Sequence, residues 1–130
     1  MSYEFVATTV SIDDDGEVVV IGISNDETAP TKYLMFQWEN ENVRSGDEEV
    51  PRQIYIEFND QIQSVYGGLG EIIYKNDIVT FHFDDYASSK LRIDGAIEVK
   101  IVKQATEFSH VISMFENIAA QYGVTIIQDW

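Results

Sequence analysis

The residues that most often carry out chemistry are few in this chain and stand apart from one another. The two histidines, His82 and His110, fall in a predicted strand and a predicted helix, and neither has a partner at the spacing of metal ligands. A zinc site needs several nitrogen or sulfur ligands that converge on one point. The run Asp13–Gly16 lacks the ligand spacing of a calcium-binding loop, and its Asp-Gly pair predicts a hairpin turn instead. We therefore expect no metal ion and no other cofactor.

Nucleophilic catalysis and phosphate binding are disfavoured on similar grounds. Ser109 and His110 are neighbours on a predicted helix, where adjacent side chains point in different directions, and the chain has no Gly-x-Ser-x-Gly motif. The glycine-rich stretch 67–70 leads into a predicted strand, whereas a phosphate-binding loop leads into the N-terminus of a helix. We therefore predict no catalytic residues and a protein that is not an enzyme.

Charge is the most unusual property of the chain. Its 130 residues include 23 acidic and 8 basic side chains, a formal net charge of −15. Such a chain repels nucleic acid and anionic lipid and attracts basic proteins, although many acidic proteins are charged only for solubility. There is no cysteine, no signal-like N-terminus and no run near the ~20 apolar residues that span a bilayer. We expect a cytoplasmic protein with a protein partner, and neither nucleic-acid nor membrane binding.

Strands are predicted over the first two-thirds of the chain by alternation of apolar and polar residues. In the third of them, residues 32–39, Leu34, Phe36 and Trp38 share the more apolar face and should point into the core. Turn residues separate the strands, as at Asn59-Asp60 and in the glycine corner 67–70. The predicted strands cover residues 5–10, 17–24, 32–39, 52–58, 61–66, 71–74, 78–84 and 96–102, with a short one at 124–127.

Two helices interrupt this pattern. Asp84 or Asp85 is a typical N-cap for a short helix that ends near Leu91. A longer amphipathic helix is predicted from about Thr106 to Tyr122, with Gly123 as its C-terminal stop. Many strands followed by a helix near the end predict an α+β fold, with a mainly antiparallel sheet and the helices packed on one face. The length suits one domain over residues 1–130.

Negative charge is concentrated in the first half of the chain. Residues 1–60 hold 14 acids and 3 bases, a net charge of −11, whereas residues 61–130 hold 9 acids and 5 bases, a net charge of −4. Loops carried by a rigid sheet are common recognition sites, and aromatic residues ringed by charge are common in interfaces. The residues predicted to bind a partner are Asp13, Asp14, Asp15, Glu39, Glu41, Asp47, Glu48, Glu49, Tyr55, Glu57 and Asp60.

Three segments resemble the immunity protein 10 family of bacterial polymorphic-toxin systems. They are residues 33–37 with Glu39, the block 54–61 that reads Ile-Tyr-Ile-Glu-Phe-Asn-Asp-Gln, and the block 64–68 that reads Ser-Val-Tyr-Gly-Gly. The resemblance extends from the first strand to about Ile101 and includes no catalytic motif. Gln61, Tyr66, Gly67 and Gly68 are interpreted as residues that form a turn and a buried hydrogen bond.

The resemblance implies an inhibitor that neutralises a toxin domain, often a nuclease, made by the same or a rival cell. An acidic protein could cover the basic cleft that a nuclease needs for its substrate. Two other classes stay open from the residues alone. One is an enzyme or small-ligand binder with an unrecognised pocket, and the other is a homo-oligomeric adaptor, for example a homodimer.

Overall fold

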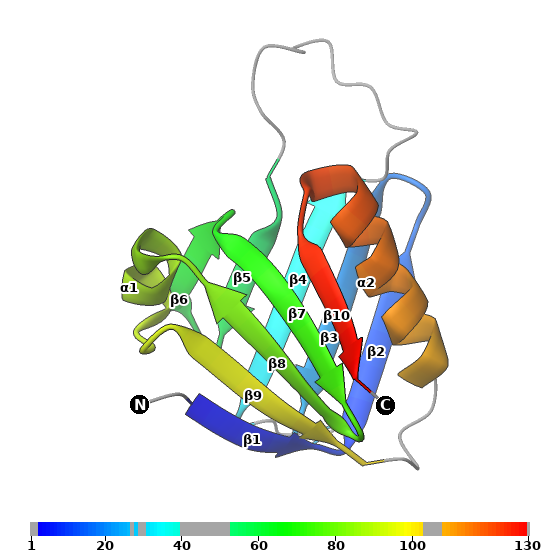
Figure 1. Cartoon of the computed structure of the whole chain (residues 1–130), viewed down its shortest axis with the longest axis horizontal. Coiled ribbons are helices and arrows are strands. Elements are labelled where there is room, and N and C mark those ends of the chain that lie inside the picture. The colour runs from blue at the N-terminus through cyan, green and yellow to red at the C-terminus, as the bar shows by residue number, and fades with distance from the viewer. Residues whose placement is uncertain (1–2, 27, 29–30, 40–52, 103–107, 130) are drawn as a thin grey trace, which may run out of the picture.

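Ten strands and two helices make up the protein in the computed structural model, which describes residues 3–26, 28, 31–39, 53–102 and 108–129 (Figure 1). The mixed α+β class predicted above is confirmed. The elements are β1 (Tyr3–Ala7), β2 (Thr9–Asp14), β3 (Val18–Ser24), β4 (Tyr33–Glu39), β5 (Tyr55–Phe58), β6 (Asp60–Tyr66), β7 (Leu69–Lys75), β8 (Ile78–Phe83), α1 (Asp85–Leu91), β9 (Ala96–Ile101), α2 (Phe108–Tyr122) and β10 (Thr125–Asp129).

The strands form two five-stranded sheets rather than one. One sheet has the order β2-β3-β4-β5-β6 and is antiparallel throughout, because each strand follows its neighbour directly in the chain. The other has the order β1-β9-β8-β7-β10. Its central pairs are antiparallel, but β1 pairs with β9 and β10 pairs with β7 in parallel. Figure 1 shows the sheets stacked face to face, with the second sheet in front.

One hydrophobic core fills the space between the two sheets. Leu34, Phe36 and Trp38 of β4 are buried, as their alternation predicted, while Met35 and Gln37 face outward and are only partly covered. Phe36 lies between Ile21 of β3 and Ile56 of β5 in the sheet register. Apolar residues on alternate positions of both sheets therefore interdigitate, as in other β-sandwiches.

The long helix α2 closes one open side of the sandwich. It packs along the edge strands β2 and β10, and Figure 1 shows it beside both of them. Its fully buried Phe115 ring lies 5.5 Å from Phe36 and 5.4 Å from Phe81, which belong to different sheets. Ile118 is also fully buried. The apolar face predicted for this helix therefore completes the core between the sheets.

Candidate functional site

The β2–β3 hairpin carries a cluster of exposed carboxylates. Asp13, Asp14, Asp15 and Glu17 are all exposed there. Asp14 Oδ1 accepts a hydrogen bond from the Gly16 backbone N–H at 3.0 Å, and Asp15 Oδ1 accepts from the N–H groups of Glu17 and Val18 at 2.8 Å each. The Val18 and Glu17 donors lower the pKa of Asp15 below its ordinary value. Asp14 and Asp15 therefore shape this turn, and the lowered pKa of Asp15 favours its charged form.

Glu39 adds a fifth carboxylate at the same end of the molecule. It is the last residue of β4 and lies opposite Val18, the first residue of β3, in the sheet register. We call Asp13, Asp14, Asp15, Glu17 and Glu39 the acidic end. Figure 1 shows the β2–β3 hairpin and the end of β4 together at the top of the molecule.

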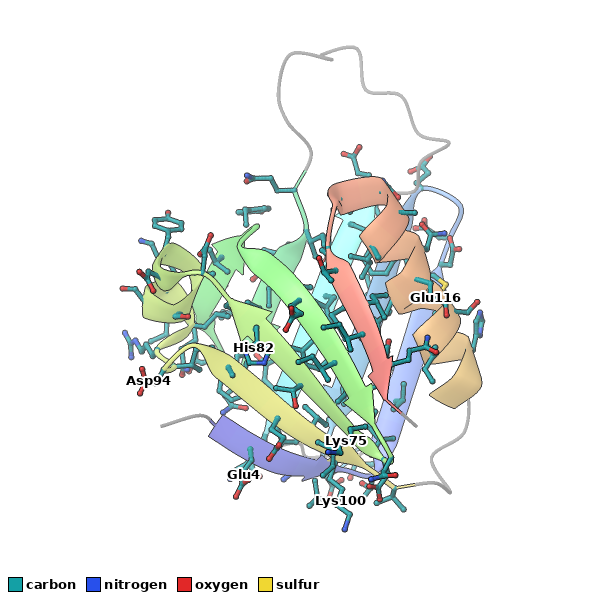
Figure 2. The ribbon with its side chains drawn as sticks, in the orientation of Figure 1. Glu4, Lys75, His82, Asp94, Lys100 and Glu116 are labelled. Atoms are coloured by element: carbon teal, nitrogen blue, oxygen red, sulfur yellow. The ribbon has the colours of Figure 1, made fainter. Side chains whose placement is uncertain are left out.

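Several lysines lie at the opposite end. Lys75 is the last residue of β7, Lys100 lies in β9, and Figure 2 shows the two near each other at the bottom of the view. Lys32 and Lys100 line one groove there, together with Glu4, Glu98 and Asn25. This end therefore mixes basic with acidic side chains, whereas the five residues of the acidic end are all carboxylates.

The remaining predicted site residues do not all join the acidic end. Asp60 begins β6, and β5 runs away from the acidic end, so Asp60 lies at the other end of that sheet. Its Oδ1 atom accepts a hydrogen bond from the Ile62 N–H at 3.2 Å. Glu41, Asp47, Glu48 and Glu49 lie outside the described residues. The structure thus brings together Asp13, Asp14, Asp15 and Glu39 of the predicted set.

Glu57 is held between two tyrosines on the outer face of the β2–β6 sheet. It is only 8% exposed, and its Oε2 and Oε1 atoms accept hydrogen bonds from the hydroxyls of Tyr33 and Tyr55, the second at 2.6 Å. Burial, followed by the hydrogen bond to Glu57, raises the pKa of both tyrosines above their ordinary value. Each carboxylate oxygen of Glu57 therefore accepts a hydrogen bond from one tyrosine, and Glu57 holds the rings of Tyr33 and Tyr55 in place.

Tyr66 extends this aromatic cluster to the surface, and Tyr86 lines the same surface groove as Tyr66. Tyr66 lies opposite Tyr55 in the register, with ring centroids 5.2 Å apart, and remains 63% exposed. Tyr86, in the first turn of α1, is 64% exposed. Sequence reasoning missed both as candidate contact residues. It assigned Tyr66 to a turn. Once β5 is paired with β6, Tyr66 lies opposite Tyr55, so both rings are on the same outer face of the sheet.

The glycine corner between β6 and β7 brings α1 against this cluster. Gly67 and Gly68 have φ angles of +80° and +91°, and the Gly67 N–H donates to the Ile54 carbonyl at 2.8 Å. A Cβ atom on Gly68 would stand 2.4 Å from Ala87 Cβ, so only glycine fits there without movement. The predicted turn role of these two glycines is confirmed, whereas Gln61 and Tyr66 are exposed.

The two histidines lie apart, exposed on β8 and α2, and Figure 2 labels His82 on the front sheet. Across the part of the chain that the structure describes, no group of three or more His, Asp or Glu residues is arranged to hold a metal ion. Neither described helix has the length and apolar character needed to cross a membrane.

Comparison with known proteins identifies one family. The family model described as Immunity protein 10 matches residues 6–109, which is most of the chain and includes strands β2 to β9 and α1. No curated protein matches the chain.

Proposed function

Since the chain belongs to the immunity protein 10 family, we propose that it binds a bacterial toxin domain and neutralises it, with the acidic end as the main contact surface. The family match over residues 6–109 carries this proposal. An immunity protein acts by occupying its partner, so the function requires a surface and no catalytic group.

The distribution of charge favours a basic toxin. Asp13, Asp15 and Glu17 project from a hairpin whose backbone is held by side-chain hydrogen bonds, so the charges are presented without a large ordering cost. A nuclease suits such a surface, because its cleft must be positively charged to hold a phosphate backbone. The acidic end would occupy or flank that cleft, in part as a mimic of nucleic acid.

The proposed contact surface includes predicted residues that the structure does not describe. Glu41, Asp47, Glu48 and Glu49 belong to residues 40–52, which connect Glu39 of the acidic end with Gln53. They remain proposed contact residues from their charge and position in the chain. Neutralisation in the cytoplasm of the producing cell is part of the same proposal, since a toxin made or received there must be inhibited before it acts.

Co-expression with the toxin encoded beside this chain tests the proposal. Bacteria that produce the toxin domain should survive when they also produce the full-length chain, and the tagged chain should retain the toxin through affinity purification. A variant with the core substitution Phe115→Ala serves as a destabilised control, because Phe115 is fully buried. Failure of the chain to protect cells, together with recovery of no toxin complex, would contradict the proposed function.

A further inference from the structure

Two strongly exposed tyrosines face one groove. Tyr66 of β6 and Tyr86 of α1 are 63% and 64% exposed, although tyrosine rings usually bury more of their apolar surface. The groove has a volume of about 470 Å³ and lies where α1 packs against β6. Its other lining residues are Gln53, Ser64, Val65, Gly68, Asp84 and Lys90.

The walls of this groove are held in place before any partner arrives. The Tyr66 ring packs at a tilt of 54° against Tyr55, whose hydroxyl donates a hydrogen bond of 2.6 Å to Glu57. On the other side, the Asp84 N–H donates to the Gly68 carbonyl at 2.9 Å, and this contact ties α1 to the glycine corner. Rigid aromatic walls lose little conformational entropy on binding, and this is typical of residues that contribute most to affinity.

The chemistry of the lining favours a cation. Asp84 Oδ1 caps α1 by accepting from the Ala87 N–H at 2.8 Å, and its carboxylate keeps further acceptor positions beyond that one bond. Within the groove, the Lys90 ammonium already lies 5.6 Å from the centre of the Tyr86 ring. That distance is within the range of a cation–π contact, so one aromatic ring of the lining already holds a cation, while Tyr66 and Asp84 are the lining residues proposed for a second one.

From this arrangement we infer that the groove receives an arginine side chain of the toxin, stacked on Tyr66 and paired with Asp84. This inference rests on the proposed function for the identity of the partner. Arginine fits better than lysine, because its planar guanidinium stacks on aromatic rings and matches a carboxylate with two parallel hydrogen bonds. A protein of net charge −15 also meets basic partners more readily than acidic ones.

The first test needs no toxin. The full-length chain is titrated with N-acetyl-arginine amide and with the neutral isostere N-acetyl-citrulline amide, while NMR follows the tyrosine ring resonances. Arginine should shift the ring signals of Tyr66 and Tyr86, and Tyr66→Ala should weaken its binding roughly 2- to 30-fold. Tyr66→Phe, which keeps the ring, should bind as the parent does. Equal binding of citrulline, or shifts confined to the β2–β3 hairpin, would overturn the inference.

The second test uses the toxin complex. Tyr66→Ala should raise the dissociation rate about 30-fold or more, as expected of a central aromatic contact. Ile62→Ala is the matched control, because Ile62 lies on the same strand, is 65% exposed and does not line the groove. Its dissociation rate should change less than about twofold. Lys90→Gln should leave the affinity for the toxin unchanged or raise it. A large loss of affinity would mean that the groove binds a carboxylate of the toxin and would overturn the inference.

The two tests separate the inference from the proposed function. If the toxin binds the parent and Tyr66→Ala with equal affinity, the groove assignment is wrong and the immunity function stands. If arginine binds the groove but no toxin complex forms, the groove chemistry stands and the proposed function fails.

Discussion

Replacing Gly68 with alanine would push a methyl group into the N-terminus of α1. The added Cβ would stand 2.4 Å from Ala87 Cβ and 2.9 Å from Asp84 Oδ1, and the residue would also hold a left-handed φ of +91°. The backbone conformation costs about 1–2 kcal/mol for a residue with a Cβ atom, and overpacking adds about 1–3 kcal/mol. We expect a loss of about 2–5 kcal/mol in the free energy of unfolding.

Gly95→Ala separates the two contributions. Gly95 has nearly the same φ, +89°, but nothing lies within 4 Å of the methyl group that alanine would add, so only the backbone cost of about 1–2 kcal/mol applies. For a chain of 130 residues, each kcal/mol lowers Tm by about 4 °C. Thermal unfolding followed by circular dichroism should therefore show a decrease of about 7–18 °C for Gly68→Ala and about 4–7 °C for Gly95→Ala.

The difference between the two variants is the informative quantity, because the change in unfolded-chain entropy is nearly the same for both. Equal decreases in Tm would mean that α1 does not pack against the glycine corner as described. The groove between α1 and β6 would then lose its structural basis as well.

Two further predictions concern the core and the tyrosines. Phe115→Ala should lower the free energy of unfolding by about 3–5 kcal/mol in urea titrations, because the Phe115 ring packs on both sheets. The control Asn117→Ala, at an exposed position of the same helix, should change it by less than about 0.5 kcal/mol. Similar changes in the two variants would contradict the position of α2. Tyr33, Tyr55 and Tyr74 have raised pKa values in the folded chain, so stability should be fully present below about pH 10 and should fall as pH rises further, since the unfolded chain ionises these groups first. Tyrosinate absorbance should show these three groups titrating last, and a single transition of all 7 tyrosines near pH 10 in the folded protein would be inconsistent with their burial.

Local patterns in the sequence predicted most of the elements. Alternation located most strands and the buried face of β4, and the Asp-Gly pair located the β2–β3 hairpin. The single strand predicted over residues 5–10 was wrong, because the chain divides there into β1 and β2, which join different sheets. Of the two caps predicted for α1, Asp84 or Asp85, the structure has Asp84. These features depend on residues that are close in the chain, so a single sequence contains the information.

The arrangement of the strands into two sheets could not be read in the same way. The parallel pairs β1–β9 and β7–β10 join segments far apart in the chain, and alternation does not identify the partner of a strand. Because side chains alternate along a strand, Tyr55 and Glu57 share one face of β5. The sequence could not show that Tyr33, from the neighbouring strand, would cover Glu57, because that contact depends on the pairing of β4 with β5.

The candidate site was predicted only in part, because the contacts between its residues also depend on how the strands pair. The charge of the hairpin is visible in the sequence, whereas its proximity to Glu39 follows from the register of β3 and β4. Tyr66 and Tyr86 line the same groove only because the glycine corner turns the chain so that α1 lies against β6.

The association rate with the toxin domain tests the proposed role of the acidic end most directly. The variant Asp13→Asn, Asp15→Asn, Glu17→Gln keeps the side-chain acceptors of the hairpin, and the control Glu4→Gln, Glu71→Gln, Glu98→Gln lies on the other sheet. Each set of three changes the net charge from −15 to −12, because three carboxylates become neutral.

For partner charges about 10 Å away, the hairpin variant should associate about 4- to 5-fold more slowly at about 10 mM salt and about 2-fold more slowly at about 150 mM. The control should stay close to the parent at both salt concentrations. Equal slowing by the two variants would mean that only total charge matters and would contradict the acidic end as the contact surface.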